Sequence, residues 1–188
     1  MGTLLADILL VNTGDKYSEK YVDNIIHMLS ATGTKYDKVH VIRDEQYDDV
    51  WNKLQLFRDF KEGPYLYFDL DVCITQNVEH LVKEGFTLLH AYWRGEHHTP
   101  LNSSIMSWQG DKSHIFKVFE KNPEYYMLAY AGIDEYIYKE GFAYDTYNAI
   151  CSSYNWQGFD PEWPVILFNQ AHEKMLEEGP WSKFMRLE

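Results

Sequence analysis

The alternation of apolar and polar stretches predicts strands and helices that follow one another along the first seventy residues. Short apolar runs at 8–11, 38–42 and 65–68 are typical of strands, and residues 21–29 carry apolar side chains at helical spacing. A second helix is predicted over 50–57. Strands that alternate with helices across short links indicate an α/β protein with a Rossmann-like, mostly parallel sheet flanked by helices.

The second half of the chain continues this pattern around one polar and aromatic stretch. Residues 92–100 predict an exposed loop. Further elements are predicted at 77–82 (helix), 86–90 and 103–108 (strands), 112–119 and from 123 onward (helices), and 165–168 (strand). Because no repeat or low-complexity linker interrupts this order, we expect one domain covering residues 1–188.

The third predicted strand ends in two carboxylates, Asp69 and Asp71. In open α/β sheets, ligands bind beyond the carboxyl ends of such strands. Side chains two positions apart in extended chain share one face, so both carboxylates can reach one hard cation, which can neutralise a diphosphate. The alternative is that one aspartate caps the following turn.

Composition and charge restrict the class of ligand. The 188 residues are 45% hydrophobic and 24% charged, which is ordinary for a globular protein, and 16% are aromatic. A net charge of −12 disfavours binding to a nucleic-acid backbone or to an anionic membrane. An anionic substrate therefore needs local help from a metal or from a few lysine and arginine side chains.

The cysteines and the N-terminal segment indicate an intracellular protein. Cys73 and Cys151 match no metal-ligand spacing, so we expect reduced thiols. The N-terminal segment from Met1 has no basic region, and Asp7 interrupts its apolar residues, which argues against a secretion signal. No run reaches the length of a membrane span. The expected location is cytoplasmic.

Other polar residues near the predicted strand ends are candidates for a site. Lys53 could approach a phosphate, or it could be a solvated surface charge. Asn102 and Ser103 offer amide and hydroxyl groups to a hydroxyl-rich ligand, with turn chemistry as the alternative. Asp134 and Glu135 open a predicted helix, where they either complement its dipole or take a catalytic or substrate-orienting role.

Histidine supplies one further candidate ligand. His172 lies four residues past the last predicted strand and could reach a metal at the carboxyl edge of the sheet. His97 and His98 have no partners at ligand spacing. The chain carries no glycine-rich phosphate loop and no Ser-His-Asp order.

Four segments in order, at 13–18, 51–54, 67–71 and 102–106, resemble the GT-A nucleotide-sugar glycosyltransferases. The similarity is to small bacterial and phage members related to glycosyltransferase family 8, and it extends over residues 8–181. It implies a single GT-A domain, the nucleotide-diphospho-sugar transferase fold.

The resemblance also implies roles for individual residues. In that family the DxD aspartates coordinate Mn²⁺ or Mg²⁺, which binds the donor diphosphate, so Asp69 and Asp71 are the implied metal ligands. The implied donor-binding residues are Val11, Asn12, Thr13 and Tyr17 for base and ribose, Lys53, and Asn102 and Ser103 along the sugar pocket. Asp134 falls near the acidic site that orients the sugar, and Asp134 or Glu135 is the first candidate base if the reaction inverts configuration.

Two positions depart from the family pattern. Family 8 members supply a third metal ligand from a His-Gly pair after the last strand, whereas Asn169 and Gln170 follow Phe168 here. His172 is the candidate replacement. The family often has Asp-Gln-Asp where this chain has Ile133-Asp134-Glu135.

The expected function is metal-dependent transfer of a sugar from a UDP- or GDP-sugar to the hydroxyl of an unknown acceptor. One alternative is a catalytically weak or inactive module that binds nucleotide sugars. The other is a phosphatase, since Asp69-Leu70-Asp71-Val72 also resembles the haloacid-dehalogenase motif. That family has the motif on its first strand, and here at least two strands are predicted before it.

Overall fold

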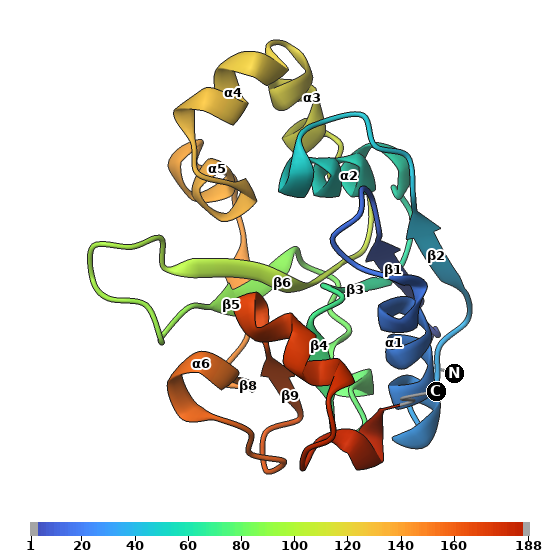
Figure 1. The fold of residues 1–188 in the computed structure, drawn as a ribbon. Coiled ribbons are helices and arrows are strands. Elements are labelled where there is room, and N and C mark those ends of the chain that lie inside the picture. The colour runs from blue at the N-terminus through green and yellow to red at the C-terminus, as the bar shows by residue number, and fades with distance from the viewer. Residues whose placement is uncertain (1–3, 186–188) are drawn as a thin grey trace.

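The fold is described from a computed structural model for residues 4–185. Residues 1–3 and 186–188 lie outside this range. Residues 1–3 are the beginning of the N-terminal segment that was considered above as a secretion signal. Within it, six strands form a central sheet in the order β2-β1-β3-β6-β5-β7 (Figure 1). They are β1 (Asp7–Val11), β2 (Val39–Ile42), β3 (Tyr65–Phe68), β5 (Thr87–His90), β6 (Leu101–Trp108) and β7 (Asp145–Thr146).

Helices and a smaller sheet cover the two faces of the central sheet (Figure 1). The small sheet has the order β4-β9-β8 and consists, among the described residues, of β4 (Val72–Ile74), β8 (Cys151–Ser153) and β9 (Val165–Leu167). The α-helices are α1 (Glu19–Ala31), α2 (Gln55–Asp59), α3 (His114–Glu120), α4 (Pro123–Ala129), α5 (Ile133–Lys139) and α6 (Tyr154–Gln157). The 3₁₀ helices are η1 (Asp49–Leu54), η2 (Glu79–Leu81), η3 (Asn169–Leu176) and η4 (Ser182–Phe184).

The mixed α/β class with a mostly parallel sheet is confirmed, with one strand reversed. Strands β1, β2 and β3 pair in parallel, as do β5 and β7. Strand β6 pairs antiparallel to both β3 and β5 and so joins the two parallel groups. Because β6 runs opposite to β3, the beginning of β6 lies beside the end of β3, and the Asp69 N–H donates to the carbonyl of Ser104 at 2.8 Å.

Both faces of the central sheet are buried along its inner strands β1, β3, β5 and β6, which explains the nearly continuous apolar runs of β1 and β3. Along β3, Leu66 and Phe68 pack on the face covered by α1 and the small sheet. Tyr65 and Tyr67 pack on the opposite face, under α2, α3 and α5. Adjacent residues of a strand therefore belong to two separate cores, as the two-residue period of a strand requires.

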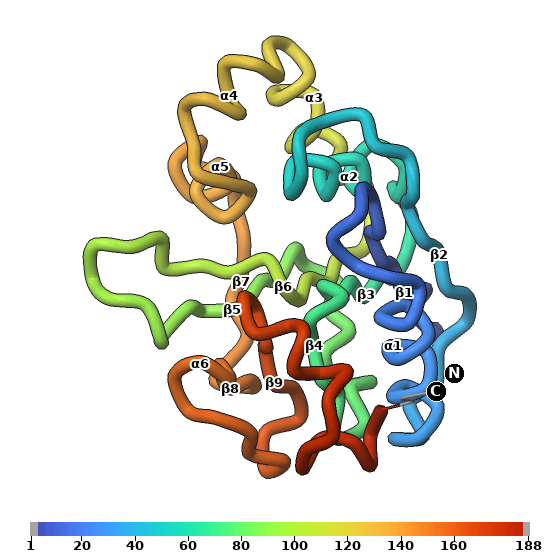
Figure 2. The backbone as a smooth tube through the Cα atoms, viewed as in Figure 1, coloured from blue at the N-terminus to red at the C-terminus, as the bar shows by residue number. Residues whose placement is uncertain are grey.

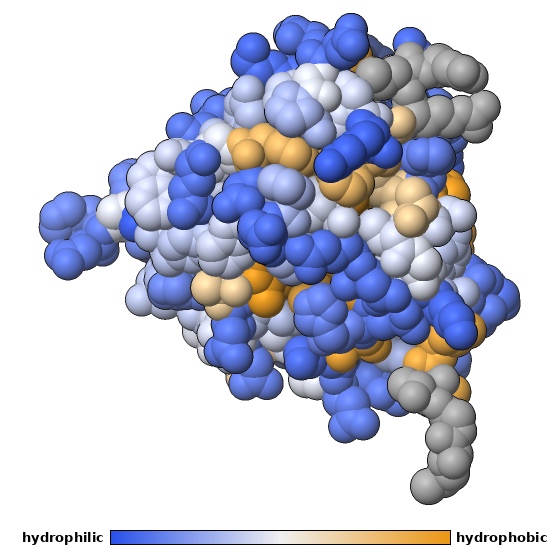
Figure 3. Space-filling view, turned by 90° about the horizontal axis from the view of Figure 1, so that it is seen from below, coloured by the Kyte–Doolittle hydropathy of each residue, from blue (hydrophilic) through white to orange (hydrophobic). Residues whose placement is uncertain are grey.

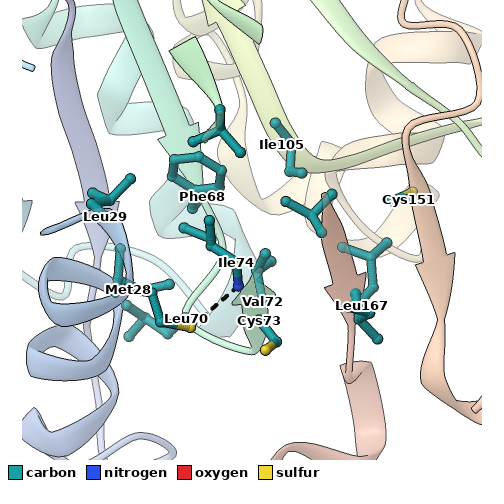
Figure 4. Packing of buried hydrophobic residues seen from close by; sticks show 14 of the residues in the cluster. Met28, Leu29, Phe68, Leu70, Val72, Cys73, Ile74, Ile105, Cys151 and Leu167 are labelled. Atoms are coloured by element: carbon teal, nitrogen blue, oxygen red, sulfur yellow. Dashed lines mark hydrogen bonds between the residues drawn. The ribbon is translucent and has the colours of Figure 1, made fainter. Parts of the chain in front are cut away.

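The first core joins the two sheets around α1 (Figure 4). Met28 of α1 and Phe68 of β3 are fully buried in it, and Cys73 and Cys151 lie in the same cluster as free thiols. The backbone N–H of Ile74 is directed at the Met28 sulfur at 3.2 Å. Packing of the small sheet against α1 therefore fixes the segment that directly follows Asp69 and Asp71.

The second core is rich in aromatic side chains. The ring of Trp108 lies 5.1 Å from that of Phe57 and 5.4 Å from that of Tyr65, measured between centroids. Trp51 of η1 stacks on Phe119 of α3 at 5.4 Å. Such pairs contribute stability beyond the area they bury. Much of the 16% aromatic content fills this core.

Most predicted elements occur within two residues of their expected bounds, but the small sheet was missed. The last predicted strand, β9, lies in this sheet and not in the central one. Its partners β4 and β8 have three residues each and follow no recognisable alternation. The predicted helix over 50–57 is present as η1 followed by α2.

The face of the molecule seen from below in Figure 3 is mainly hydrophilic, with apolar side chains confined to small separate patches. A polar loop between β5 and β6 projects from the body of the molecule at the left of Figures 1 and 2. Among residues 4–185, no helix has both the length and the apolar character needed to cross a bilayer.

Candidate functional site

A cleft of about 560 Å³ opens at the edge of the sheet where β1 and β3 end and β6 begins. The chain following β1, the η1 helix, the β5–β6 loop and the beginning of α5 form its walls. The predicted site residues that line it are Val11, Thr13, Tyr17, Lys53, Asp69, Asp71, Asn102, Ser103, Asp134 and Glu135. The cleft is thus at the carboxyl edge of the parallel strands, where ligands of open α/β sheets bind.

Asp69 lies at the centre of this cleft with two neighbours at hydrogen-bond distance. Its Oδ1 atom is 2.8 Å from Lys53 Nζ, and it also accepts a hydrogen bond from the Tyr67 hydroxyl. Tyr67 is fully buried, and burial together with the Asp69 charge raises the pKa of its phenol well above the usual value. The phenol therefore stays protonated and donates to Asp69.

Lys53 is buried, so the alternative interpretation of this residue as a solvated surface charge is wrong. The residue is 9% exposed, and its ammonium group lies over the ring of Tyr67 at 5.2 Å. The ammonium group donates to the hydroxyl of Ser103 at 3.1 Å in addition to its ion pair with Asp69. A buried ammonium group needs such partners, because desolvation of an unpaired charge is costly.

Asp71 is the more deeply buried of the two carboxylates. The Tyr17 hydroxyl donates to its Oδ2 at 3.1 Å, whereas Oδ1 is buried and has no hydrogen-bond partner among the described residues. Burial and the nearby charge of Asp69 raise the pKa of Asp71 to about 7. A carboxylate of this kind favours binding of a cation, which would restore its charged form.

Asp134 connects the beginning of α5 with the beginning of β6. Its Oδ1 accepts from the Ser103 backbone N–H at 2.9 Å and from the Ser103 hydroxyl at 2.5 Å. Its Oδ2 accepts from Arg94 at 2.9 Å and from the Asn102 amide at 3.4 Å. All of these partners lie outside α5, whereas an acid that only complements the dipole of its own helix needs no such contacts. They tie the side chains that line the cleft into one network.

Glu135 is held mainly by its own helix. Its Oε2 accepts from the backbone N–H of Ala131 at 2.7 Å, and its Oε1 is 2.5 Å from Lys139 Nζ. The Ala131 hydrogen bond, followed by that of Lys139, lowers the pKa of Glu135. These contacts are those of a residue that completes a helix N-terminus. The predicted role of either acid as a general base stays a prediction.

Two of the predicted site residues are not among the described residues that line the cleft. Asn12 points to Glu19, to which its amide donates at 3.2 Å. The His172 ring packs edge-on against Tyr17 with 5.1 Å between centroids, and its Nδ1 is buried with no partner among the described residues. Asn169, in contrast, lines the cleft together with both aspartates.

The donor set is compatible with a hard divalent cation that shares its coordination with a substrate. Asp69, Asp71 and Asn169 all line the cleft, and the partnerless Oδ1 of Asp71 is a carboxylate oxygen that can serve as a ligand to a cation. Among residues 4–185, no group of three or more His, Cys, Asp or Glu side chains is placed so that it could hold a metal ion. Mg²⁺ and Mn²⁺ sites in phosphate chemistry commonly use one or two carboxylates and complete their shell with phosphate and water.

The sequence interpretation missed several residues of the site. Arg94 lies in the loop predicted to be exposed, yet it binds Asp134 and donates to the carbonyl of Leu101 at 2.8 Å. Lys16 lines the cleft beside Tyr17. Nothing in the sequence pairs an arginine in a long loop with an aspartate forty positions later, so only the folded chain reveals that contact.

Comparisons with known proteins show which solved structures have a similar fold. A scan against protein-family models and a search of curated proteins found no match. A structure of a glycosyltransferase involved in the glycosylation of the major capsid of PBCV-1 is similar, with a TM-score of 0.62 and 12% identity, over 90% of this chain and 98% of that one. The glycosyltransferase GlyE of Streptococcus pneumoniae TIGR4 is similar with a TM-score of 0.65 and 8% identity, and its apo form with 0.64 and 9%.

The chain has the fold of these glycosyltransferases. The GlyE comparisons cover 97% of this chain and 62% of each GlyE chain, so this chain spans about three fifths of the GlyE length. At such low identity the similarity establishes the fold, and the chemistry has to be argued from the site.

Proposed function

We propose that the protein is a metal-dependent glycosyltransferase of the GT-A type that uses a nucleotide-diphosphate sugar. The observation that carries this proposal is the presence of Asp69, Asp71 and Lys53 in one cleft at the carboxyl edge of the sheet, with Lys53 ion-paired to Asp69. The fold supports this proposal, because the two proteins of similar fold, the PBCV-1 capsid enzyme and GlyE, are described as glycosyltransferases. The relation to family 8 belongs to the same proposal.

The metal in this proposal is Mn²⁺ or Mg²⁺, held by Asp69 and Asp71. Asn169 is the third protein group that lines the cleft with them, while His172 packs behind Tyr17. When bound, such a cation stabilises the negative charge of the departing diphosphate. Lys53 and Lys16 supply further positive charge to the same cleft.

The reaction replaces one bond to the anomeric carbon with another. The bond between that carbon and the diphosphate oxygen breaks, and a bond to the acceptor hydroxyl oxygen forms. The hydroxyl proton leaves, and the nucleoside diphosphate departs with the bonding electron pair. Asp134 lines the cleft and is fixed by Ser103 and Arg94, so it can orient sugar hydroxyls.

The donor has two distinct surroundings in the cleft. The tip after β1, with Val11, Thr13 and Tyr17, is assigned to the base and ribose of a UDP- or GDP-sugar. The wall from Asn102 to Asp134 offers amide, hydroxyl and carboxylate groups to the sugar. Aromatic and apolar groups at one end and convergent polar groups at the other are typical of a ligand cleft.

Titration with UDP, GDP and their sugars, with Mn²⁺ or Mg²⁺ present, tests the proposal by calorimetry and by release of nucleoside diphosphate. Metal-dependent binding and release are expected for the wild type, and Asp69→Asn and Asp71→Asn should lose both. Asp23→Asn, an exposed aspartate on α1, is the matched control. If no nucleotide or nucleotide sugar binds with either metal, the proposal is wrong.

Two alternatives give different results in the same experiment. A binding module without turnover would be stabilised thermally by a nucleotide sugar but would release no diphosphate. A phosphatase that forms an aspartyl-phosphate on Asp69 would hydrolyse phosphate esters, and this activity would vanish in Asp69→Asn. Two observations argue against the phosphatase. Asp69 follows the third strand of the chain and not the first, and the fold is similar to that of glycosyltransferases.

A further inference from the structure

A second cleft of about 430 Å³ lies directly beside the first. Arg94, Asn169 and Gln170 line both clefts. The walls come from the β5–β6 loop, from α6 and from the beginning of η3, which gather on one side of the molecule in Figure 2. A ligand in the second cleft would therefore lie against the same side chains as a ligand in the first.

Indole rings form the apolar part of the second cleft. Trp93 and Trp156 line it, and Trp156 is 59% exposed although it is a large aromatic residue. The ring of Tyr92 lies 5.8 Å from Trp156 and 5.3 Å from Trp93, and it also stacks on Trp163 at 6.4 Å. The Tyr92 hydroxyl donates to the Cys151 carbonyl. These contacts hold the two indoles in place while much of Trp156 remains open to a ligand.

The polar side chains of the second cleft are uncharged, apart from one arginine. Asn155, Asn169 and Gln170 contribute side-chain amides, which can donate and accept hydrogen bonds at the same time. Arg94 is the one charged residue among the described residues that line this cleft. Its guanidinium group is already bound to Asp134 and to the carbonyl of Leu101.

This chemistry selects one class of ligand. A phosphate or carboxylate would find no uncommitted positive charge in the second cleft, and the net charge of −12 would repel it. A sugar ring presents hydroxyl groups at its rim, which match amide side chains, and a C–H face, which packs on an indole. A pocket of aromatic rings with a few convergent polar groups is of the size and kind that holds such a ligand.

We propose that the second cleft binds the acceptor and that the acceptor is a carbohydrate, a neutral sugar ring packed against Trp156. The acceptor role rests on the proposed function, because it assumes that a sugar donor occupies the first cleft. The shared wall of Arg94, Asn169 and Gln170 brings the acceptor hydroxyl next to the donor. The bond changes are those described above, with a sugar hydroxyl as the attacking group.

Binding of methyl glycosides tests the second cleft directly. The probes are the methyl glycosides of glucose, galactose, mannose, N-acetylglucosamine, fucose and rhamnose, with a serine peptide amide for comparison. Saturation-transfer NMR and tryptophan fluorescence report binding without any turnover. At least one glycoside should bind the wild type, and Trp156→Ala should weaken that binding by roughly tenfold. Asn155→Ala should weaken it less.

The control variant is Tyr125→Ala, which removes an aromatic side chain that is 58% exposed on α4. It should bind the glycoside as the wild type does. Trp156 is itself mostly exposed, so Trp156→Ala should fold, and circular dichroism checks this. The inference is overturned if no glycoside binds, if only the serine peptide binds, or if Trp156→Ala binds the glycoside like the wild type.

Nucleotide titration of the wild type separates failure of this inference from failure of the proposed function. Nucleotide binding without glycoside binding overturns the inference and leaves the proposed function in place. Glycoside binding that depends on Trp156, without any nucleotide binding, supports a sugar site in the second cleft and counts against the proposed function. When both bind, the glycoside should accelerate release of nucleoside diphosphate, and Trp156→Ala should raise the KM for the glycoside.

Discussion

The Nζ atom of Lys53 lies 2.8 Å from the Oδ1 atom of Asp69, and both belong to the cleft at the carboxyl edge of the sheet. The pair joins the η1 helix to the end of β3. It also means that the protein by itself neutralises one of its two clustered carboxylates. A divalent cation that binds Asp69 must therefore compete with a lysine, while a diphosphate arriving with the cation gains that lysine as a partner.

Lys53→Met separates these two effects, because methionine keeps much of the side-chain length and removes the charge. Affinity for Mn²⁺ alone should rise, since the competing ammonium group is gone. Affinity for a nucleoside diphosphate in the presence of Mn²⁺ should fall by roughly tenfold, because one charge-assisted contact is lost. Calorimetric titration of metal, and of nucleotide at saturating metal, measures both.

Lys20→Met is the control for this experiment, since Lys20 is exposed on α1. It should behave like the wild type in both titrations. A fall in Mn²⁺ affinity in Lys53→Met would contradict the competition between Lys53 and the cation. Unchanged nucleotide affinity would remove Lys53 from the donor site.

The raised pKa of Asp71 predicts a pH-dependent stability of the metal-free protein. The pKa is about 7 in the folded state against 3.8 for an ordinary aspartate, so the folded state binds the proton more tightly. The contribution of Asp71 is fully present below pH 4 and is lost as the pH rises through 7. Between pH 5 and pH 8 the wild type should lose roughly 2–3 kcal/mol relative to Asp71→Asn. Urea unfolding in EDTA measures this difference.

Saturating Mn²⁺ should reverse this trend above pH 7, because the cation favours the charged carboxylate. The same denaturation series with metal tests this reversal. Identical pH slopes for the wild type and Asp71→Asn in EDTA would show that Asp71 titrates as an ordinary carboxyl.

Arg94→Met should impair turnover more than nucleotide binding. Arg94 is 2.9 Å from Asp134 and also holds the carbonyl of Leu101, so its loss removes the one cation that holds Asp134 among the described residues and loosens the end of the β5–β6 loop. We expect kcat to fall by roughly ten- to a hundredfold because the sugar is positioned less well. Steady-state release of nucleoside diphosphate gives kcat and KM. Arg43→Met, which breaks an exposed pair with Glu19, is the comparison variant. Equal kcat in both variants would argue against the positioning role.

Truncation of two tryptophans to alanine should change the free energy of unfolding by very different amounts. Trp108 is completely buried between Phe57 and Tyr65, whereas Trp156 is 59% exposed. Trp108→Ala should lower the free energy of unfolding by about 3–5 kcal/mol, since it removes a large core side chain and leaves a cavity. Trp156→Ala should change it by less than about 1 kcal/mol. Urea denaturation of both variants tests the assignment of core and surface.

The sequence predicted the part of the fold that long apolar runs encode. Residues 65–68 were expected as a strand buried on both faces, and β3 has these bounds. The reversal of β6 was not predicted, because its residues are buried on both faces in either direction. The strands β4 and β8 were missed because three residues are too few to show a period.

The candidate site was predictable where a side chain directly follows a strand. Asp69 and Asp71 at the end of β3 and Ser103 at the beginning of β6 line the cleft, and their roles there stay a prediction. Partners on loops were not predictable. Arg94 meets Asp134 only because the fold brings the beginning of the β5–β6 loop next to the beginning of α5, and no local pattern records that contact.

The reversed direction of β6 has a consequence for how the protein could be altered. In a purely parallel sheet, the chain that enters a strand lies at the edge away from the ligand. Here the segment that enters β6, residues 91–100, borders both clefts, and its exposed part from Gly95 to His98 includes His97 and His98, which line the first cleft. Residues can therefore be inserted or exchanged at this tip without changing any strand register. The tip is the natural position for engineering a different ligand preference into this scaffold.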